Sequence, residues 1–333
     1  MSVPLLKAIR GAQRYGFAVG KVRVLQTRTV GAGTYERLLD APTFSEQLRV
    51  LSDTLYGRYL EDAGTAEDVE SGLERALDDF YRFLDEANLP APVVRFFRVR
   101  YDYANLRAVL KARALGVSTD GLVEDLGTVP ADVVTGPVGG LPAFLGDVVT
   151  SLHLDDVESE RIIEVIDGGV EAALFADLVH TARQSKSSTL RELATLTVDV
   201  ANARTAVRAR RRGLKVSALT PMLYPGGAIR ISDIEKAYAL SVEDFIGMLA
   251  ASRALKGVAA EELAADGGLD VVLDNLLSRF IRRVRVVQFG PEPVIAYVMA
   301  REAEVVAVRT LLIGRLAGLD REALRRRLRD LSV

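Results

Sequence analysis

The chain has 333 residues, of which 49 % are hydrophobic and 26 % are charged, so it can build hydrophobic cores and is not intrinsically disordered. Its formal net charge of −2 argues against a general nucleic-acid binder. It has no cysteine, which excludes disulfides, thiolate zinc sites and cysteine nucleophiles and fits an intracellular protein.

The beginning of the chain, MSVPLLKAIRGAQRYG, lacks the long apolar core of a signal peptide. No apolar run reaches the roughly 18 residues needed to cross a bilayer. We therefore expect a protein that is soluble or that is held on a membrane by a partner.

Helical periodicity and proline positions predict the elements of the first third of the chain. An amphipathic helix begins within residues 15–34 and continues towards Leu39. Further helices are expected, in chain order, over 44–59, 67–87 and 93–115. Pro90 and Pro92 precede the last of these.

Residues 118–143 then change in character, because they are rich in Gly, Val and Pro and carry few charges. This is the clearest boundary in the chain. The default interpretation is a linker, and the alternative is a loop that meets an apolar partner. After it, we expect helices that open at Phe144 and that cover 157–182 and 185–214.

The stretch PMLYPGGAIRISD is a second boundary, with Ser232 or Asp233 as the expected cap of the next helix. Later helices are expected over 245–258 and 269–289, around the segment 303–319, and in a short basic tail over 321–331. No run of strict apolar–polar alternation is bounded by turn residues. The predicted class is all-α.

One block organises the chain because it occurs three times, at 101–117, 198–214 and 303–319. Each copy has an acid, a residue three positions later that is Asn in two copies, an arginine two further on, a second arginine and a glycine. The acid-to-glycine distance is 14 residues in all three copies. The positions are Asp102, Asn105, Arg107, Arg113 and Gly116; Asp199, Asn202, Arg204, Arg210 and Gly213; and Glu304, Ala307, Arg309, Arg315 and Gly318.

The block is typical of a helix that ends at its glycine after a basic last turn. At about 100° per residue, the acid, the residue three on and the second arginine share one face. We favour a polar network within the fold as the explanation, since half-buried polar groups usually pair internally. The alternative is a surface for a partner.

A second landmark supports the repetition. Phe44, Phe144 and Phe245 are each expected to open a helix, and they precede their acids by 58, 55 and 59 residues. We therefore predict three similar helical units: residues 1–118, residues 119–217 with the linker, and residues 218–333 with the basic C-terminal helix.

The common catalytic motifs are absent from the sequence. There is no phosphate-binding loop and no Gly-x-Ser-x-Gly elbow. Gly31 and Gly33 begin a dinucleotide pattern, but Glu36 stands where its third glycine belongs. The two histidines, His153 and His180, have no matched carboxylates for a metal. We predict no catalytic, cofactor-binding or metal-binding residue, and hence a protein that is not an enzyme.

The basic run near the end of the second copy has two interpretations. A solvated face is the favoured one, above all for Arg211 and Arg212, and an acidic partner is the alternative. RNA is disfavoured because neither stacking aromatics nor excess positive charge accompanies the run. The run consists of Arg204, Arg208, Arg210, Arg211, Arg212 and Lys215.

Several segments together resemble the C subunit of the prokaryotic V-type or A-type rotary ATPase, whose eukaryotic counterpart is the d subunit. They are YDYANLR at 101–107, SDTLYGRYL at 52–60, PGG at 225–227 and the final GRLAGL at 314–319. The resemblance extends over nearly the whole chain, although residues 120–140 are more divergent.

The resemblance implies a funnel of three helical subdomains about a pseudo-threefold axis. Such a protein is a non-catalytic central-rotor adaptor without cofactors. It caps the membrane proteolipid rotor ring, receives the central-shaft subunits in its hollow, and so couples ATP turnover to transport of H⁺ or Na⁺. Its implied location is peripheral, on the cytoplasmic face of the membrane, with neither nucleic acid nor a small-molecule substrate as partner.

If the resemblance holds, Arg113, Arg210 and Arg315 ring the axis and are candidates for binding acidic groups of the shaft. The internal network described above explains the same residues. Two other functions compete with the adaptor: a helical-repeat scaffold for an unrelated protein, and an enzyme with an unrecognised polar site.

Overall fold

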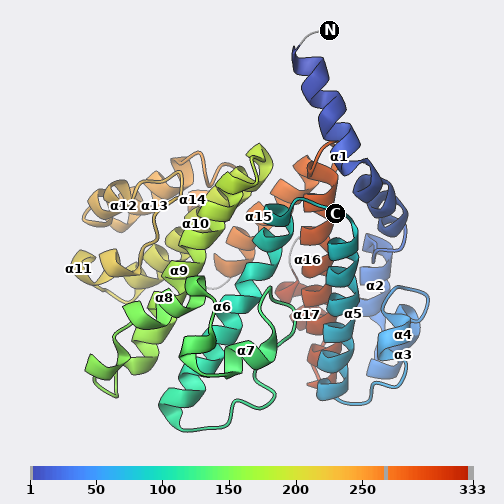
Figure 1. Cartoon of the computed structure of the whole chain (residues 1–333), viewed down its shortest axis with the longest axis horizontal. Coiled ribbons are helices and arrows are strands. Elements are labelled where there is room, and N and C mark those ends of the chain that lie inside the picture. The colour runs from blue at the N-terminus through green and yellow to red at the C-terminus, as the bar shows by residue number, and fades with distance from the viewer. Residues whose placement is uncertain (1–2, 266–268, 329–333) are drawn as a thin grey trace. The chain divides into compact units, whose positions relative to one another are not determined.

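The computed structural model describes residues 3–265 and 269–328, and every regular element within these ranges is helical (Figure 1). The predicted all-α class is confirmed. The chain forms two compact units: one joins residues 1–89 to residues 265–333, and the other consists of residues 90–264. The first unit therefore brings together the two ends of the sequence.

The unit that holds both ends is built around α16 (Glu292–Leu316). Helices α1, α5 and α15 pack along it, and α17 packs on both α16 and α2. Figure 1 shows α5 and α16 side by side. The other helices are α1 (Val3–Gln26), α2 (Ala32–Asp40), α3 (Phe44–Leu51), α4 (Gly57–Leu60), α5 (Ala66–Glu86), α15 (Leu269–Arg285) and α17 (Arg321–Arg327).

The middle unit is built on α9 (Ile162–Gln184), which packs against α6 (Ala91–Leu115) on one side and α10 (Ser188–Arg211) on another. Short helices surround these three. They are α7 (Ala131–Thr135), α8 (Ala143–Ser151), α11 (Val216–Leu219), α12 (Ile231–Tyr238), α13 (Val242–Ala251) and α14 (Ala260–Ala264), with 3₁₀ turns at 138–140, 154–156 and 220–222.

Helix α5 illustrates how the sequence specifies an element. Thr65 and Asp68 form a capping box at its start, in which each side chain accepts a hydrogen bond from the other residue's backbone N–H. Its expected apolar face is buried, and each such side chain contributes roughly 1.5–3 kcal/mol. The face consists of Val69, Leu73, Leu77, Phe80 and Leu84.

The three long helices that carry the repeated block end in the same way. Gly116, Gly213 and Gly318 all have left-handed backbone angles, with φ of 66°, 67° and 78°. In each case the glycine N–H and the next N–H bond back to carbonyls of the last turn, which is the Schellman pattern. The predicted glycine termination is confirmed in all three copies.

Two helices expected near the N-terminus are each broken in the structure, and the first begins at Val3 rather than within residues 15–34. The helix expected from 15 to 39 is interrupted by a turn at residues 27–31, so α1 and α2 are separate. The helix expected over 44–59 ends at Leu51, and α4 forms only at Gly57. Helical periodicity could not reveal these breaks, because they depend on distant residues: the Val30 N–H bonds Glu304, and the Tyr56 ring packs against Arg301.

Other boundaries also differ from the predictions. Helix α9 begins at Ile162 rather than 157, α13 runs from Val242 only to Ala251, and α15 ends at Arg285. The cap of α12 is Arg230, not Ser232 or Asp233, and the Asp233 carboxylate instead pairs with Arg230 at 2.8 Å. In the tail, α17 ends at Arg327, and residues 329–331 lie outside the described residues.

The segment over 118–143 is more than a linker. Leu126, Val129 and Val134 are buried in it, and it contains the short helix α7. The plain-linker interpretation is therefore wrong for this part of the chain. What holds the segment in place is the acid of the first repeated block.

Candidate functional site

The first copy of the block holds the segment that follows it through two polar side chains of α6. Asp102, which is fully buried, accepts the backbone N–H groups of Thr128 at 2.7 Å and Val129 at 2.9 Å, and the Thr128 hydroxyl at 2.6 Å. Asn105 donates to the Glu124 carbonyl at 2.7 Å and accepts the Glu124 N–H at 3.0 Å. We call the first of these arrangements the acid–loop contact.

The second copy repeats this geometry on α10. Asp199 accepts the N–H groups of Ala228 and Ile229, both at 2.9 Å. Asn202 donates to the Tyr224 carbonyl and accepts the Tyr224 N–H, both at 2.8 Å. These polar atoms are compensated within the fold, which is what burial of an aspartate and an asparagine requires.

A glycine stands at the same place in both loops. A Cβ atom on Gly127 would lie 2.2 Å from a carboxylate oxygen of Asp102, and one on Gly227 would lie 2.2 Å from an oxygen of Asp199. Each glycine therefore lets the loop backbone approach the carboxylate closely enough to donate its next N–H groups. The sequence contains this signal, since a glycine precedes Val129 and Ile229 by two residues, but the sequence analysis did not use it.

The third copy has different chemistry in the same register. On α16, Glu304 accepts hydrogen bonds from the Val30 N–H and from Arg301 Nη1, the latter at 2.5 Å. Arg301 and Glu304 are each only 4 % exposed, and the Arg301 guanidinium lies 5.0 Å from the centre of the Tyr56 ring. Ala307 stands where the other copies have asparagine.

Burial dominates the electrostatics of all three acids. It raises the pKa of Asp102 and of Asp199 above the ordinary value, although the hydrogen bonds they accept act in the opposite direction. Burial likewise raises the pKa of Glu304, opposed chiefly by the Arg301 charge. The surrounding apolar packing also raises the pKa of Tyr297 to about 12.

The second arginine of each copy completes the pattern. Arg113 donates to the carbonyls of Thr135 and Gly136, Arg210 to those of Tyr238 and Leu240, and Arg315 to those of Leu39 and Leu319, at distances from 2.5 to 3.0 Å. We call each of these an arginine cap. The carbonyls belong to the C-terminal ends of α7, α12 and α2, with Leu319 as the exception.

The two contacts thus hold a short helix at both ends. In each copy the acid–loop contact lies just before the short helix, and the arginine cap lies at its end. Helix α6 holds α7, α10 holds α12, and α16 holds α2. The three candidate arginines share one role inside the fold, which agrees with the favoured interpretation of a polar network.

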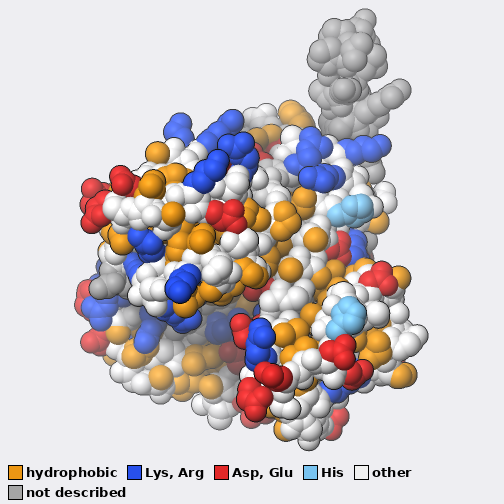
Figure 2. Space-filling view, turned by 90° about the vertical axis from the view of Figure 1, so that its left-hand side faces the viewer, with side chains coloured by type: hydrophobic (Ala, Val, Ile, Leu, Met, Phe, Trp, Pro, Cys, Tyr) orange, Lys and Arg blue, Asp and Glu red, His pale blue; other side chains and the backbone are white. Residues whose placement is uncertain are grey.

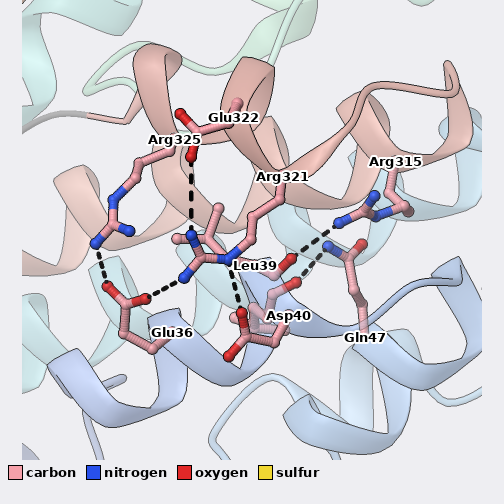
Figure 3. Close-up of polar contacts among 9 residues, drawn as sticks. Glu36, Leu39, Asp40, Gln47, Arg315, Arg321, Glu322 and Arg325 are labelled. Carbon is pink, nitrogen blue, oxygen red and sulfur yellow. Dashed lines mark hydrogen bonds and ion pairs between the residues drawn. The ribbon is translucent and has the colours of Figure 1, made fainter.

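Helix α2 receives further contacts from α17, as Figure 3 shows. Arg321 pairs with Asp40 at 2.7 Å and with Glu36 at 3.1 Å, and Arg325 also pairs with Glu36, at 2.8 Å. Beneath them the fully buried Gln47 donates to the Leu38 carbonyl at 2.9 Å. The last helix of the chain is therefore fixed to one of the first.

Other polar residues singled out from the sequence have local roles. Arg309 pairs with Glu70 at 2.7 Å. Arg211 was expected on a solvated face, but it donates to the carbonyls of Leu263 and Ala264 at the end of α14. It is nevertheless exposed, as is Arg212, so the expected solvated face is confirmed for both residues.

The two histidines lie apart. His153 Nδ1 contacts the Ser151 carbonyl, and His180 Nε2 contacts Gln184. Figure 2 shows them as separate pale blue patches. Among residues 3–265 and 269–328, no group of three or more histidines and carboxylates could hold a metal ion. A small cavity of about 30 Å³ lies beside Glu304 and Tyr297, with room for about one water molecule.

None of the helices within the described ranges is both long enough and apolar enough to span a bilayer.

Comparison with known proteins gives a consistent result. The model of the family "ATP synthase (C/AC39) subunit" matches residues 18–327. The C subunit of the V-type sodium ATPase of Enterococcus hirae is 23 % identical, over 93 % of this chain and 96 % of its own length. The C subunits of the A-type ATP synthases of Desulfurococcus sp. and Halobacterium salinarum are 25 % and 24 % identical, over 89 % and 94 % of this chain and 85 % and 96 % of their own lengths.

Proposed function

Since the chain belongs to the ATP synthase (C/AC39) subunit family, we propose that it is the C subunit of a V-type or A-type rotary ATPase. In this role it is a non-catalytic adaptor that joins the central shaft to the membrane proteolipid ring and transmits torque between them. The observation that carries the proposal is the family match over residues 18–327, together with relatives of the same name that align along nearly their whole length.

The repeated contacts support a mechanical role. A part that transmits torque must resist deformation, and loops are ordinarily its most deformable segments. In this chain the segments before α2, α7 and α12 are fixed by buried carboxylates, and the ends of the same helices are fixed by arginines. These contacts stiffen the connections between helices.

We further propose that the three repeats, residues 1–118, 119–217 and 218–333, are arranged in a closed cycle. The first long helix holds the short helix of the second repeat, the second holds that of the third, and the third holds that of the first. A cyclic order of this kind is what three helical subdomains around a central opening require. It supports the funnel with a pseudo-threefold axis that the family resemblance implies.

The proposed partners are the central-shaft subunits and the proteolipid ring, and the proposed location is peripheral, on the cytoplasmic face of the membrane. Contact of Arg113, Arg210 and Arg315 with acidic groups of the shaft stays a prediction. The arginine caps give these side chains a structural role already. A salt titration of binding to the isolated shaft subunits, with the three arginines changed to Ala, tests the shaft contact: an unchanged salt slope contradicts it.

The adaptor proposal is tested in native membranes. Affinity purification of the tagged chain after detergent extraction is expected to recover shaft subunits and proteolipid together. Depletion of the chain should leave ATP hydrolysis by the catalytic head intact while abolishing ATP-driven ion transport. A tagged helical protein from outside the complex is the control for the purification.

Recovery of an unrelated protein, with no ATPase subunit, would instead support a helical-repeat scaffold and contradict the proposal. Loss of hydrolysis and transport in equal measure on depletion would also contradict it, because an adaptor is needed for coupling and not for the chemistry.

A further inference from the structure

Two segments of the chain are basic and contain no acid. Residues 15–35 have three basic residues, Lys21, Arg23 and Arg28, and residues 275–291 have four, Arg279, Arg282, Arg283 and Arg285; neither range contains Asp or Glu. The whole chain has 45 acidic and 43 basic residues, so such ranges are a marked departure from its average. The first range covers the second half of α1, the turn after it and the start of α2, and the second covers the C-terminal part of α15 and the turn after it.

The same two segments expose large apolar side chains. Phe17 and Val24 of α1 are 60 % and 62 % exposed, and Val286 and Phe289 after α15 are 78 % and 68 % exposed. These are among the most exposed large apolar residues in the described part of the chain. Apolar side chains this exposed, when they are grouped, mark an interaction site rather than ordinary surface.

The two segments lie next to each other in one unit. Arg23 on α1 donates to the carbonyl of Val287 at 3.1 Å. Arg23 and Arg28 on one segment and Arg283 on the other are exposed. We define the basic–apolar surface as Phe17, Arg23, Val24, Arg28, Arg283, Val286 and Phe289.

We propose that the basic–apolar surface binds an anionic phospholipid membrane. The arginines meet the lipid headgroup phosphates, and the phenylalanine and valine side chains enter the boundary between headgroups and acyl chains. Basic residues each contribute to attraction by a negatively charged leaflet, and exposed aromatic and aliphatic side chains add apolar burial. This contact holds the chain on a membrane independently of any protein in it.

A lipid surface fits this surface better than an acidic protein does. A specific protein–protein interface usually has pockets for large apolar anchor residues. These residues lie in a well-packed core, and the charges around them are paired. Here the grouped apolar residues are interspersed with arginines. Neither segment contains an acidic residue. A fluid headgroup layer needs no such complementarity.

The experiment uses the full chain and protein-free vesicles. Co-sedimentation is measured with vesicles of phosphatidylcholine alone and with vesicles of phosphatidylcholine and phosphatidylglycerol in equal parts. Binding is expected only to the anionic vesicles, and it should weaken as salt is added. Because these vesicles contain no ATPase subunit, the result is independent of the proposed function.

Two variants and two matched controls locate the surface. Changing Arg23, Arg28 and Arg283 to Gln is expected to lower partitioning about a hundredfold. Changing Phe17, Val286 and Phe289 to Ser is expected to lower it at least about tenfold. The controls carry the same numbers of changes at exposed positions of the middle unit: Arg161, Arg191 and Arg253 to Gln, and Leu115, Val117 and Leu122 to Ser.

The circular dichroism spectrum and thermal midpoint of each variant show whether it folds. The proposal is overturned if the wild type binds both kinds of vesicle equally or binds neither. It is also overturned if the control variants lose as much binding as the variants of the basic–apolar surface. Failure to bind lipid, with retention of the ATPase subunits in the membrane purification, would assign the surface to a protein of the complex.

Discussion

The acid–loop contacts of α6 and α10 and that of α16 occupy the same register but use different groups. In α6 and α10 the acid is an aspartate that accepts backbone N–H groups, with an asparagine one turn later that binds the same loop. In α16 the acid is Glu304, which pairs with Arg301 inside the core, and the asparagine is replaced by Ala307. Arg301 stands where α6 has Val99 and α10 has Leu196.

The difference follows the length of chain that each contact closes. The arginine caps of α6 and α10 join residues 22 to 30 positions apart, whereas that of α16 reaches Leu39 across 276 positions. Closing the longer loop costs roughly 2 kcal/mol more in chain entropy. At this closure the fold adds the α17 contacts with Glu36 and Asp40, and within α16 it places the buried Arg301–Glu304 pair beside the closing segment. The two ends of the chain are thus joined by ion pairs between side chains as well as by bonds to backbone groups.

The largest expected effect comes from removing the Glu304 carboxylate. Glu304→Ala leaves the Arg301 guanidinium buried without its carboxylate, and it also leaves the Val30 N–H without its acceptor. Removing one partner of a buried pair costs about 3–5 kcal/mol. Urea unfolding of the full chain, monitored by circular dichroism, measures this loss.

The matched control removes both charges. In Arg301→Leu with Glu304→Gln, no charge remains buried, and the Gln oxygen still accepts the Val30 N–H. The double variant is expected to be more stable than Glu304→Ala. If the double variant is less stable than Glu304→Ala, the ion pair stabilises the fold by more than the desolvation of its charges costs. An uncharged residue at position 301 would then not be equivalent to Val99 in α6 or Leu196 in α10.

The second prediction concerns the glycines that only the two inner contacts require. Gly127→Ala and Gly227→Ala each place a methyl group 2.2 Å from a carboxylate oxygen, so that the acid or the loop must move. Overpacking together with weakened N–H bonds should cost about 3 kcal/mol in each variant. The measurement is the urea midpoint at constant slope.

Two controls accompany this measurement. Gly139→Ala and Gly140→Ala meet no atom within 4 Å and should be nearly neutral. In the third copy the position that corresponds to Gly127 and Gly227 is Arg28, two residues before Val30. Arg28 is exposed. Arg28→Ala should therefore leave stability almost unchanged, and a loss as large as that in Gly127→Ala would contradict the proposed difference between the contacts.

The sequence predicted those features that depend on neighbouring residues. Helix α5 and its apolar face, the termination of three helices at glycine, and the shared register of the acids and arginines all follow from local periodicity and capping. A polar network inside the fold was also the favoured interpretation of the block.

The partners of that network could not be predicted, because they are backbone groups of segments remote from the block. Nothing local to Val30 indicates that its N–H binds Glu304, and nothing local to Thr135 indicates that its carbonyl binds Arg113. Residues 118–143 are rich in glycine and carry few charges, and this composition indicated a linker because the sequence does not show which distant groups the segment binds. That composition reflects a loop that buries Leu126 and Val129 and donates backbone N–H groups to the buried Asp102.

A third prediction uses pH to compare an inner acid with an exposed one. Asp199→Asn replaces one of the two acceptor oxygens that face N–H groups by a donor, and should cost about 2 kcal/mol at neutral pH. Burial raises the folded-state pKa of Asp199, so between the unfolded and the folded pKa the native state binds more protons. The contribution of Asp199 to stability therefore falls as pH rises through that window.

It follows that the stability advantage of the wild type over Asp199→Asn should grow as pH falls through the window. Asp68 provides the opposite sign, because hydrogen bonds from the Gly64 N–H and from Thr65 lower its pKa. The advantage of the wild type over Asp68→Asn should shrink as pH falls through the folded pKa of Asp68. Urea unfolding across the acid range measures both advantages, and equal slopes for both variants would contradict the burial argument.

The smallest expected effects distinguish arginine caps from surface ion pairs. Arg315→Met keeps the apolar stem of the side chain but removes the donors to the Leu39 and Leu319 carbonyls, and should cost about 1 kcal/mol. Arg321→Met breaks the exposed pairs with Asp40 and Glu36 and should cost between about 0.2 and 1 kcal/mol. Both losses are measured in urea, which is uncharged, at low and at high concentrations of sodium chloride.

Salt is the deciding variable in that experiment. The partners of Arg315 are neutral carbonyls, so the cost of Arg315→Met should persist at high ionic strength. The partners of Arg321 are exposed carboxylates, so the cost of Arg321→Met should decline towards zero as the charges are screened. Arg326→Met, at an exposed position of α17, controls for the loss of one charge. If the cost of Arg315→Met is screened as strongly as that of Arg321→Met, the third copy is held by charge pairs rather than by a cap, and its likeness to α6 and α10 is restricted to the sequence.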